Sequence, residues 1–398
     1  MNVILFDQEN SWKNLLPLTY TRPISEIRIG ILTIKQKWDT ELNTNCSYST
    51  KGFLAKKFPL KEQPDSLFIN GCVCPTPALL AEIKKLKPLQ ALLKNNELLA
   101  LVGEARNVKA LIDVEKIEFK GEVLNITNVW DVFQKNAEAL KLDFELLTKN
   151  KKSQALSNTV TVIGDKKLVF LEEGAKAEAC IFNTSGGPIY LAKDSEVMEG
   201  SAVRGPFALG EHSALKLNTK IYGATTIGPH CKIGGEVNNS VIFGFTNKAH
   251  DGFLGNSVLG EWCNLGADTN NSNLKNNYGN VKLFNYLQTK MVDSGLQFCG
   301  LIMGDHSKSG INTMFNTGTV VGVGANIYGG SFPATHIPSF SWGGSEGFET
   351  YRLDKMFETA EKVFERRSLK LDTIEKEILS EVFEKTKEFR LISNQNRS

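Results

Sequence analysis

Residues 197–233 read VMEGSAVRGPFALGEHSALKLNTKIYGATTIGPHCKI, and an aliphatic residue recurs in this stretch at every sixth position. The recurring residues are Val197, Val203, Leu209, Leu215, Ile221, Ile227 and Ile233. An α-helix cannot use this period, because six residues at ~100° each turn successive members onto three different faces. A solenoid of short strands can use it, since each aliphatic side chain then points into the same interior.

The repeating hexads also share a glycine at their second position. The matches are LGEHSA at 209, IGPHCK at 227, IGGEVN at 233, LGEWCN at 259, LGADTN at 265 and VGVGAN at 321. Each hexad predicts a short strand and a corner, where glycine permits the turn. Three hexads form one coil of about 18 residues, stacked by parallel backbone hydrogen bonds. The pattern predicts a left-handed parallel β-helix whose phase slips after Ile233, resumes at Phe253 and is lost from about 275 to 300.

The segments on either side of the repeats follow other periods. Before them, short apolar strands at 1–6, 66–71 and 91–103 alternate with helical patterns at 31–38 and 78–86, which predicts an α/β domain over 1–155. The polar stretch 148–158 is the expected linker to a β-helix domain over 156–343. Residues 344–398 predict packing helices, the second of which begins at Asp372 with Glu375 three residues on.

The composition argues against a nucleic-acid-binding protein, a membrane protein and a disulfide-bonded secreted protein. The 398 residues include 46 Lys and Arg against 44 Asp and Glu, a net charge of +2, so we expect neither nucleic acid nor a membrane as partner. No signal peptide or long apolar stretch is visible, which predicts a cytoplasmic protein. Seven cysteines, an odd number, predict reduced thiols. Cys72 and Cys74 lack a second ligand pair, so we expect no structural metal.

Residues 247–275, NKAHDGFLGNSVLGEWCNLGADTNNSNLK, contain one histidine, six asparagines and few charged residues. Histidine is the side chain that exchanges a proton near neutral pH, so His250 is a candidate general base. The residues alone also allow a structural reading, in which His250 is a polar loop residue and the asparagines occupy left-handed corners.

The same motifs carry a family resemblance. Residues 248–275, together with LIMGDHSKSGIN at 301–312, resemble the C-terminal half of bifunctional GlmU-type enzymes, which make UDP-N-acetylglucosamine. The chain is more similar still to a divergent group found in Bacteroidetes-type bacteria, related to sugar-1-phosphate nucleotidylyltransferases with a β-helix tail. LPLTYTRPISEIRIGILTIKQKW at 16–38 resembles the N-terminal domain of that group.

The resemblance implies an acetyl-CoA-dependent N-acetyltransferase that acts on an amino-sugar phosphate of the glucosamine 1-phosphate class at a trimer interface. His250 matches the catalytic base, and Asn264 and Asn273 match residues that orient the sugar and acetyl-CoA. His306 with Lys308 is a second candidate for the acetyl-CoA end, although a satisfied loop histidine is the alternative. His212, His230 and His336 have no motif and are given no role.

The acceptor site departs from the family pattern. Phe253 stands where the family has a tyrosine, and Tyr222 and Asn238 stand where it has two basic residues for the sugar phosphate. Without Arg or Lys, a phosphate loses its charge-assisted hydrogen bonds. The candidates to replace them are Arg204, Lys216, Lys220 and Lys248, and Lys275 is a further candidate for substrate binding. The alternatives are that these are surface charges or that the acceptor is another sugar.

The N-terminal domain departs further from a nucleotidylyltransferase. Residues 7–23, DQENSWKNLLPLTYTRP, contain no glycine, whereas the family cradles its triphosphate in a glycine-rich loop. Asn70, Gly71 and Cys72 stand where the family has a Gly-Asp pair for Mg²⁺, and a thiol suits this hard cation poorly. The remaining candidates for nucleotide binding are Asp7, Lys13, Arg22, Asn70 and Gly71.

Three functions therefore remain open at this stage. The first is the N-acetyltransferase with a degenerate nucleotidylyltransferase-like domain. The second is a Mg²⁺-dependent nucleotidylyltransferase, of the thymidylyltransferase or UDP-N-acetylglucosamine pyrophosphorylase type, that uses the β-helix as a trimerisation scaffold. The third is a ligand-binding protein without catalysis.

Overall fold

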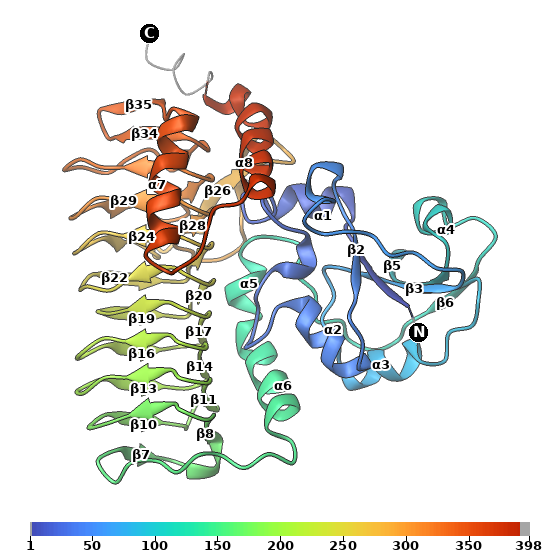
Figure 1. Ribbon diagram of the computed structural model, residues 1–398, viewed down its shortest axis with the longest axis horizontal. Coiled ribbons are helices and arrows are strands. Elements are labelled where there is room, and N and C mark those ends of the chain that lie inside the picture. The colour runs from blue at the N-terminus through green and yellow to red at the C-terminus, as the bar shows by residue number, and fades with distance from the viewer. Residues whose placement is uncertain (1, 391–398) are drawn as a thin grey trace.

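The computed structural model describes residues 2–390. Figure 1 shows a tall β-helix beside a smaller α/β domain, with two helices from the C-terminal part packed at the upper end of the β-helix. The predicted fold, an α/β domain followed by a β-helix and C-terminal helices, is confirmed.

The β-helix has three parallel faces, which we call the first, second and third face. The first comprises β7 (Thr161–Ile163), β10 (Ile181–Asn183), β13 (Ala202–Arg204), β16 (Lys220–Tyr222), β19 (Glu236–Asn238) and β22 (Phe253–Gly255). The second comprises β8 (Val169–Leu171), β11 (Ile189–Leu191), β14 (Phe207–Leu209), β17 (Thr225–Ile227), β20 (Val241–Ile242), β23 (Val258–Leu259), β28 (Ile302–Met303), β31 (Val320–Val321) and β33 (His336–Ile337).

The third face comprises β9 (Lys176–Ala177), β12 (Glu196–Val197), β15 (Ala214–Leu215), β18 (Lys232–Ile233), β21 (Asn247–Lys248), β24 (Asn264–Leu265), β29 (Lys308–Ser309), β32 (Asn326–Ile327), β34 (Ser341–Gly344) and the antiparallel β35 (Gly347–Thr350). Two further strands, β25 (Asn270–Asn271) and β30 (Met314–Phe315), pair with each other in the upper coils.

The strand register confirms the coil length. Leu191 pairs with Leu209, 18 positions on (209 − 191), and Leu209 pairs with Ile227 at the same spacing. The predicted slip is also present, because Ile233 pairs with Lys248 after only 15 positions (248 − 233).

The predicted loss of pattern between 275 and 300 is an insertion. Asn264 pairs with Lys308, 44 positions on (308 − 264), and the extra residues hold an antiparallel hairpin, β26 (Lys282–Asn285) and β27 (Lys290–Asp293). The predicted phase was wrong by one residue at β22, since Leu254 is fully buried while Phe253 is partly exposed, but Leu259 and Leu265 are interior as predicted.

The α/β domain is built on a mixed sheet with the order β2-β1-β3-β5-β4-β6. Its strands are β1 (Val3–Phe6), β2 (Ser47–Ser49), β3 (Ser66–Asn70), β4 (Gln90–Lys94), β5 (Glu97–Gly103) and β6 (Glu115–Glu118). The helices are α1 (Glu9–Asn14), α2 (Ile34–Leu42), α3 (Pro77–Ile83), α4 (Ala105–Ala110), α5 (Asp131–Gln134) and α6 (Asn136–Thr148), with 3₁₀ turns at Ile24–Glu26 and Gly52–Leu54. A third 3₁₀ turn, Lys166–Leu168, joins β7 to β8 of the β-helix. The expected strand pair at 91–103 is β4 and β5.

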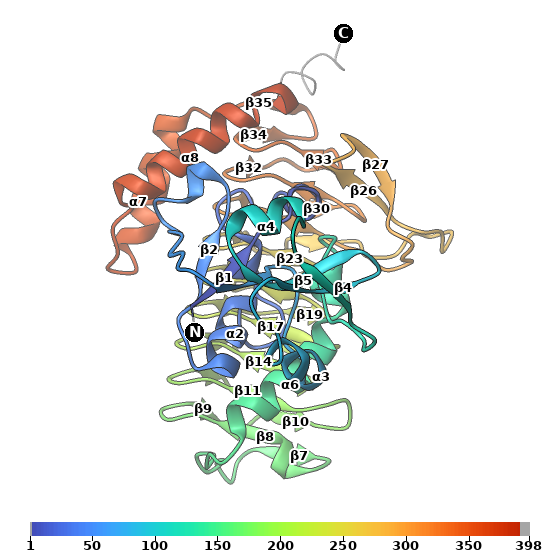
Figure 2. The same cartoon turned by 90° about the vertical axis from the view of Figure 1, so that its right-hand side faces the viewer.

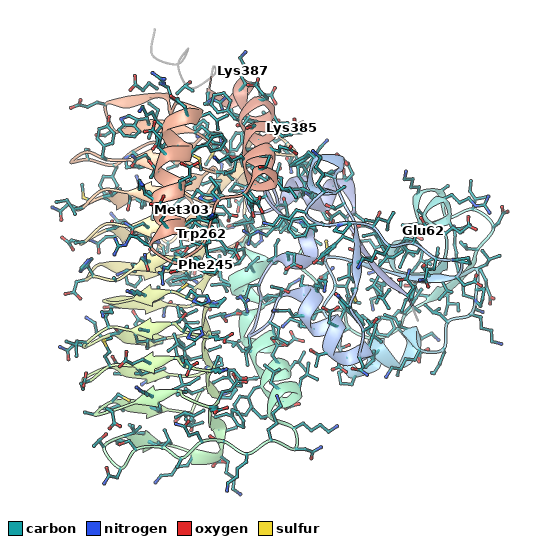
Figure 3. The ribbon with its side chains drawn as sticks, in the orientation of Figure 1. Glu62, Phe245, Trp262, Met303, Lys385 and Lys387 are labelled. Atoms are coloured by element: carbon teal, nitrogen blue, oxygen red, sulfur yellow. The ribbon has the colours of Figure 1, made fainter. Side chains whose placement is uncertain are left out.

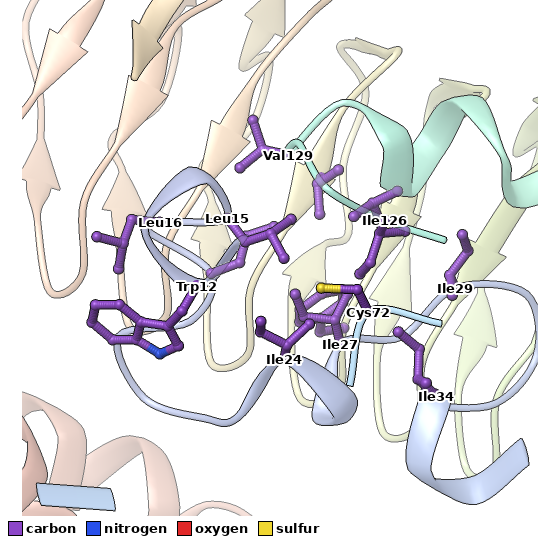
Figure 4. Packing of buried hydrophobic residues seen from close by; sticks show 14 of the residues in the cluster. Trp12, Leu15, Leu16, Ile24, Ile27, Ile29, Ile34, Cys72, Ile126 and Val129 are labelled. Carbon is purple, nitrogen blue, oxygen red and sulfur yellow. The ribbon is translucent and has the colours of Figure 1, made fainter. Parts of the chain in front are cut away.

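The α/β domain packs on the second face of the β-helix (Figure 2). Asn136 at the start of α6 donates to the carbonyl of Ala224 at 2.9 Å, and Thr226 donates to the carbonyl of Gly30 at 2.8 Å. One continuous apolar cluster joins the two domains; Figure 4 shows its N-terminal part, which includes Trp12, Leu15, Ile24 and Ile27. The domains therefore share a core.

Two C-terminal helices, α7 (Leu353–Glu365) and α8 (Thr373–Lys385), pack beside the upper coils of the β-helix (Figure 1). Met356, Ala360 and Phe364 are buried along α7, as the periodicity predicts. Asp372 caps α8 by accepting from the backbone N–H of Glu375 at 2.8 Å. Across residues 2–390, no helix is long and apolar enough to cross a membrane.

Candidate functional site

His250 and Asn264 line one groove between the third face of the β-helix and the last turns of α7. The groove has a cavity volume of about 610 Å³. Its wall on the β-helix comes from β18, β21, β24 and β29 and the corners beside them, and its opposite wall from Val363, Arg366 and Arg367. The structure thus brings the predicted base and one predicted asparagine to the same cavity.

A column of stacked rings fixes α7 beside this groove. The rings of His212, His230, Phe245, Trp262 and His306 stack in order along one corner of successive coils, where each residue is left-handed with φ between +55° and +62°. Phe364 of α7 stacks on Trp262 with ring centroids 3.9 Å apart. Figure 3 shows Trp262 and Phe245 one above the other at the lower end of α7. The buried stack of Phe364 on Trp262 therefore sets where Arg366 and Arg367 lie.

His250 lies on an exposed corner directly after β21. Within residues 2–390, its imidazole has no hydrogen-bond partner, so both ring nitrogens are open to a ligand or to solvent. Its backbone is tightly held: Gly252 has φ +118°, and a Cβ there would lie 2.2 Å from the carbonyl oxygen of Thr269 in the next coil. The corner therefore requires glycine at position 252. The imidazole of His250, two residues earlier, projects from this closely packed backbone.

Four cations line the groove: Lys232, Lys308, Arg366 and Arg367. None of the described residues that line it is Asp or Glu. Arg367 donates to the side-chain oxygen of Asn247 at 3.3 Å, and Lys308 donates to the carbonyl of His306 at 3.0 Å. Burial lowers the pKa of Lys308. Because no carboxylate compensates these charges, the groove favours a ligand with several negative charges.

Cys263 also lines the groove, but its thiol is not an activated nucleophile. The side chain is 1% exposed, and its Sγ donates to the carbonyl of Gly304 at 3.3 Å. Burial raises the pKa of this thiol to about 12. A thiolate, rather than a thiol, attacks carbonyl groups, so burial leaves Cys263 unsuited to nucleophilic attack.

The predicted acceptor residues lie mainly on the first face. Arg204, Tyr222 and Asn238 end consecutive strands in one column, and the hydroxyl of Tyr222 donates to Glu236 at 2.6 Å. Asn273 donates to the side-chain oxygen of Asn256 at 2.8 Å. A Cβ at Gly255 would touch both Phe253 and Asn273, so these two lie together above the column. His250 lies at the corner between β21 of the third face and β22 of the first face, so within one chain these residues lie on the first face and the groove lies on the third face.

The other lysine candidates are engaged or buried. Lys275 donates to the carbonyl of Asn280 at 2.6 Å, and Lys220 lies 3.8 Å from a carboxylate oxygen of Glu236. Lys248, predicted to bind substrate, is 1% exposed, because its side chain fills the interior position of β21. Its ammonium is closed off from direct contact with a ligand.

The N-terminal candidates Asp7, Asn70 and Gly71 meet at the carboxyl ends of β1 and β3, where Phe6 pairs with Asn70. Their oxygens are already used: Asp7 accepts from the backbone N–H of Ile24 at 3.0 Å and from the hydroxyl of Thr50 at 2.5 Å, and Asn70 accepts from the N–H of Cys72 at 3.0 Å. Burial raises the pKa of Asp7 to about 6, so its carboxylate is less favoured than that of an exposed aspartate.

These residues do not fit Mg²⁺, which requires available anionic oxygen ligands. Across the described residues, no group of three or more His, Cys, Asp or Glu side chains is arranged for a metal ion. Lys13, another candidate, pairs with Glu9 at 3.2 Å on the surface of α1.

Arg22 takes part in the contact between the domains. Its guanidinium pairs with Asp305 and lies 3.3 Å from Glu261, both on the β-helix, and Asp305 also accepts from the hydroxyl of Thr21 at 2.6 Å. These groups border a second cavity of about 290 Å³ between the domains. His306 borders this second cavity, and burial lowers its pKa to about 3. The ring of Trp262 separates the two cavities, since it lines both.

Residues 3–152 match the family model of sugar nucleotidyl transferases. The chain is 28% identical over 221 residues to a bifunctional sugar-1-phosphate nucleotidylyltransferase/acetyltransferase from Sulfurisphaera tokodaii. This alignment covers 55% of the chain and 48% of the relative, so the chain spans about half the length of the curated protein it matches.

The solved structures matched include two UDP-N-acetylglucosamine acyltransferases. The Arabidopsis protein has a TM-score of 0.24 and 16% identity, covering 61% of this chain and 96% of that one. The Campylobacter jejuni protein has a TM-score of 0.26 and 16% identity, covering 59% and 83%. The matched proteins are transferases, and the sequence match supports the broad sugar nucleotidyltransferase family without singling out the GlmU type.

Sequence reasoning missed Lys232, Arg366 and Arg367. The two arginines directly follow the apolar stripe of α7 in the sequence FERRSLK, but nothing in that sequence says where α7 folds back.

Proposed function

We propose that the β-helix transfers an acetyl group from acetyl-CoA to the amine of an amino-sugar phosphate, with His250 as the general base. One observation carries the proposal: a free imidazole shares a 610 Å³ groove with four cations that no lining carboxylate compensates. The phosphates of CoA supply the negative charge that this groove favours, and Arg366 and Arg367 form the charge-assisted contacts.

The transfer proceeds directly between the two bound substrates. The amine nitrogen attacks the thioester carbonyl, His250 takes the proton lost by the nitrogen, and the C–S bond breaks as CoA leaves and is protonated at sulfur. Asn264, on the same wall of the groove, donates toward the developing oxyanion. An acyl-enzyme on Cys263 is not required, because burial keeps that thiol protonated.

The acceptor binds where the first face of one chain meets the groove of another. Tyr222, Asn238 and Phe253 lie on the first face, around a corner from the groove, and Asn273 follows β25 and lies beside Phe253. A homotrimer places the first face of one copy against the groove of its neighbour, with the three axes parallel. The amino sugar of the glucosamine 1-phosphate class is the acceptor that we propose for this shared site.

A second function is favoured by the family match of residues 3–152. Nucleotidylyl transfer in the α/β domain predicts release of pyrophosphate from a nucleoside triphosphate and a sugar 1-phosphate, dependent on Mg²⁺ and unaffected by His250→Ala. The hydrogen-bonded state of Asp7 and Asn70 makes this the weaker of the two proposals.

The test is release of CoA thiol from acetyl-CoA with glucosamine 1-phosphate as acceptor. We expect His250→Ala to lower kcat by about 10² or more, the usual scale for losing a general base. His212→Ala, which removes an exposed histidine at the end of the ring column remote from Phe364 and outside the groove, is the matched control and keeps the wild-type rate. Equal loss in both variants, or none in His250→Ala, overturns the assignment of the base.

A further inference from the structure

Lys248 occupies an interior position of the third face at which the preceding strands β12, β15 and β18 hold aliphatic side chains. On the third face, the interior residues of consecutive strands are Val197, Leu215, Ile233, Lys248 and Leu265. Lys248 is 1% exposed, as its neighbours are. Lysine side chains usually extend so that the ammonium reaches solvent. An ammonium enclosed inside the β-helix is therefore unusual and points to a specific role.

The ammonium of Lys248 joins two coils. It donates to the carbonyl of Gly234 at 2.8 Å and to the carbonyl of His250 at 2.8 Å. The first acceptor belongs to the preceding coil, and the second belongs to the residue proposed as the base. Gly235 closes this contact, since it has φ +73° and a Cβ there would lie 2.9 Å from the Nζ atom.

Burial of this charge disfavours folding. The pKa of Lys248 falls to about 8, mainly through desolvation, with Asp251 and Asp268 opposing the fall from outside ion-pair distance. Within the described residues, no carboxylate lies within 4.0 Å of the ammonium. An aliphatic residue in this column would avoid the penalty, so packing alone does not account for a lysine here.

We infer that Lys248 is a positioning residue that holds the His250 corner in place by tying its backbone carbonyl to the preceding coil. The corner is otherwise exposed, and the free imidazole of His250 has no hydrogen bond of its own among residues 2–390. Charge-assisted hydrogen bonds to two carbonyls restrict the backbone from which the imidazole projects. This contact keeps the imidazole of His250 at the groove, where a small displacement of the base would lower the rate of acetyl transfer.

The experiment replaces Lys248 by methionine, which fills the interior but cannot donate. Ile233→Met, one coil earlier in the same column and outside the groove, is the matched control. Hydrogen exchange of the backbone amides at 249–252, followed by mass spectrometry, reads the corner without reference to activity. We expect exchange there to accelerate at least ~10-fold in Lys248→Met and to stay unchanged in Ile233→Met. Should Lys248→Met not fold, Lys248→Leu, the residue found at 215 and 265, takes its place.

The kinetic part rests on the proposed acetyl transfer. With acetyl-CoA and glucosamine 1-phosphate, we expect kcat of Lys248→Met to fall ~10-fold or more while both KM values stay within ~2-fold. Unchanged exchange at 249–252 overturns the inference, as does accelerated exchange with an unchanged kcat. Accelerated exchange in a protein whose wild type transfers no acetyl group supports the tie to the corner and instead overturns the proposed function.

Discussion

Removing the enclosed charge of Lys248 changes how the stability of the protein depends on pH. Burial lowers the pKa of Lys248 from 10.5 to about 8, so between these two values the unfolded chain holds a proton that the folded protein has released. The free energy of unfolding therefore rises with pH across this window. At ~1.4 kcal/mol per pKa unit, the full gain from this one group is about 3 kcal/mol.

Lys248→Met lacks this titration while keeping the interior filled. We expect the variant to be at least as stable as the wild type near neutral pH, because it no longer encloses a charge. Its advantage should then shrink by about 3 kcal/mol as the pH is raised from ~8 to ~10.5. Other groups titrate in the same range, but they are common to both proteins and cancel in the difference.

The assay is urea unfolding of both proteins at steps of pH, with the same m-value required of both. Ile233→Met, measured in parallel, should track the wild type at every pH. A stability difference that stays flat from ~8 to ~10.5 would refute the reasoning, since Lys248 would then keep its ordinary pKa in the fold.

Three further predictions concern other groups. Arg22→Met should lower the free energy of unfolding by ~3–5 kcal/mol, because Asp305 stays buried without its cation; urea unfolding that shows under ~1 kcal/mol would contradict this. Replacing Arg366 and Arg367 together by alanine should raise KM for acetyl-CoA ~10-fold or more with little change in kcat, measured by thiol release; a fall in kcat alone would instead place them at the reacting atoms. Cys263→Ala should retain acetyl transfer without a burst of acyl-enzyme, and loss of turnover in this folded variant would point to a covalent step.

The β-helix could be predicted from the sequence because its period is local. Each coil repeats every 18 residues, and the aliphatic column from Val197 to Ile233 fixes the face that points inward. The prediction failed where the coil shortens to 15 residues, because a single missed step moves Phe253 and Leu254 to opposite sides. The prediction that Lys248 binds substrate was wrong, because a lysine in the sequence is normally expected at the surface and the shortened coil places this one inside.

The groove could be predicted only in part. His250 and Asn264 lie on consecutive coils of the β-helix, so the repeat that predicts the coils also predicts that these two residues are close. Arg366 and Arg367 reach the groove only because Phe364 stacks on Trp262, about 100 residues away in the sequence (364 − 262). Long-range packing of this kind has no local signal.

The second face shows the same limit. α6 covers the second face, and its Asn136 donates to the carbonyl of Ala224. The sequence predicts a linker at 148–158, after this helix, but does not predict that the helix packs on the β-helix. The hydrogen bond that Asp7 accepts from Ile24, which weakens the case for Mg²⁺, likewise depends on how segment 8–27 packs over the sheet.

The central claim is that the groove beside His250 transfers an acetyl group to an amino sugar. Mass spectrometry of the acceptor, after incubation of the wild type with isotopically labelled acetyl-CoA and glucosamine 1-phosphate, tests it directly. The account predicts a labelled N-acetyl product from the wild type and its loss in His250→Ala. An unmodified acceptor from folded wild-type protein, with this and with other amino-sugar phosphates, would contradict it.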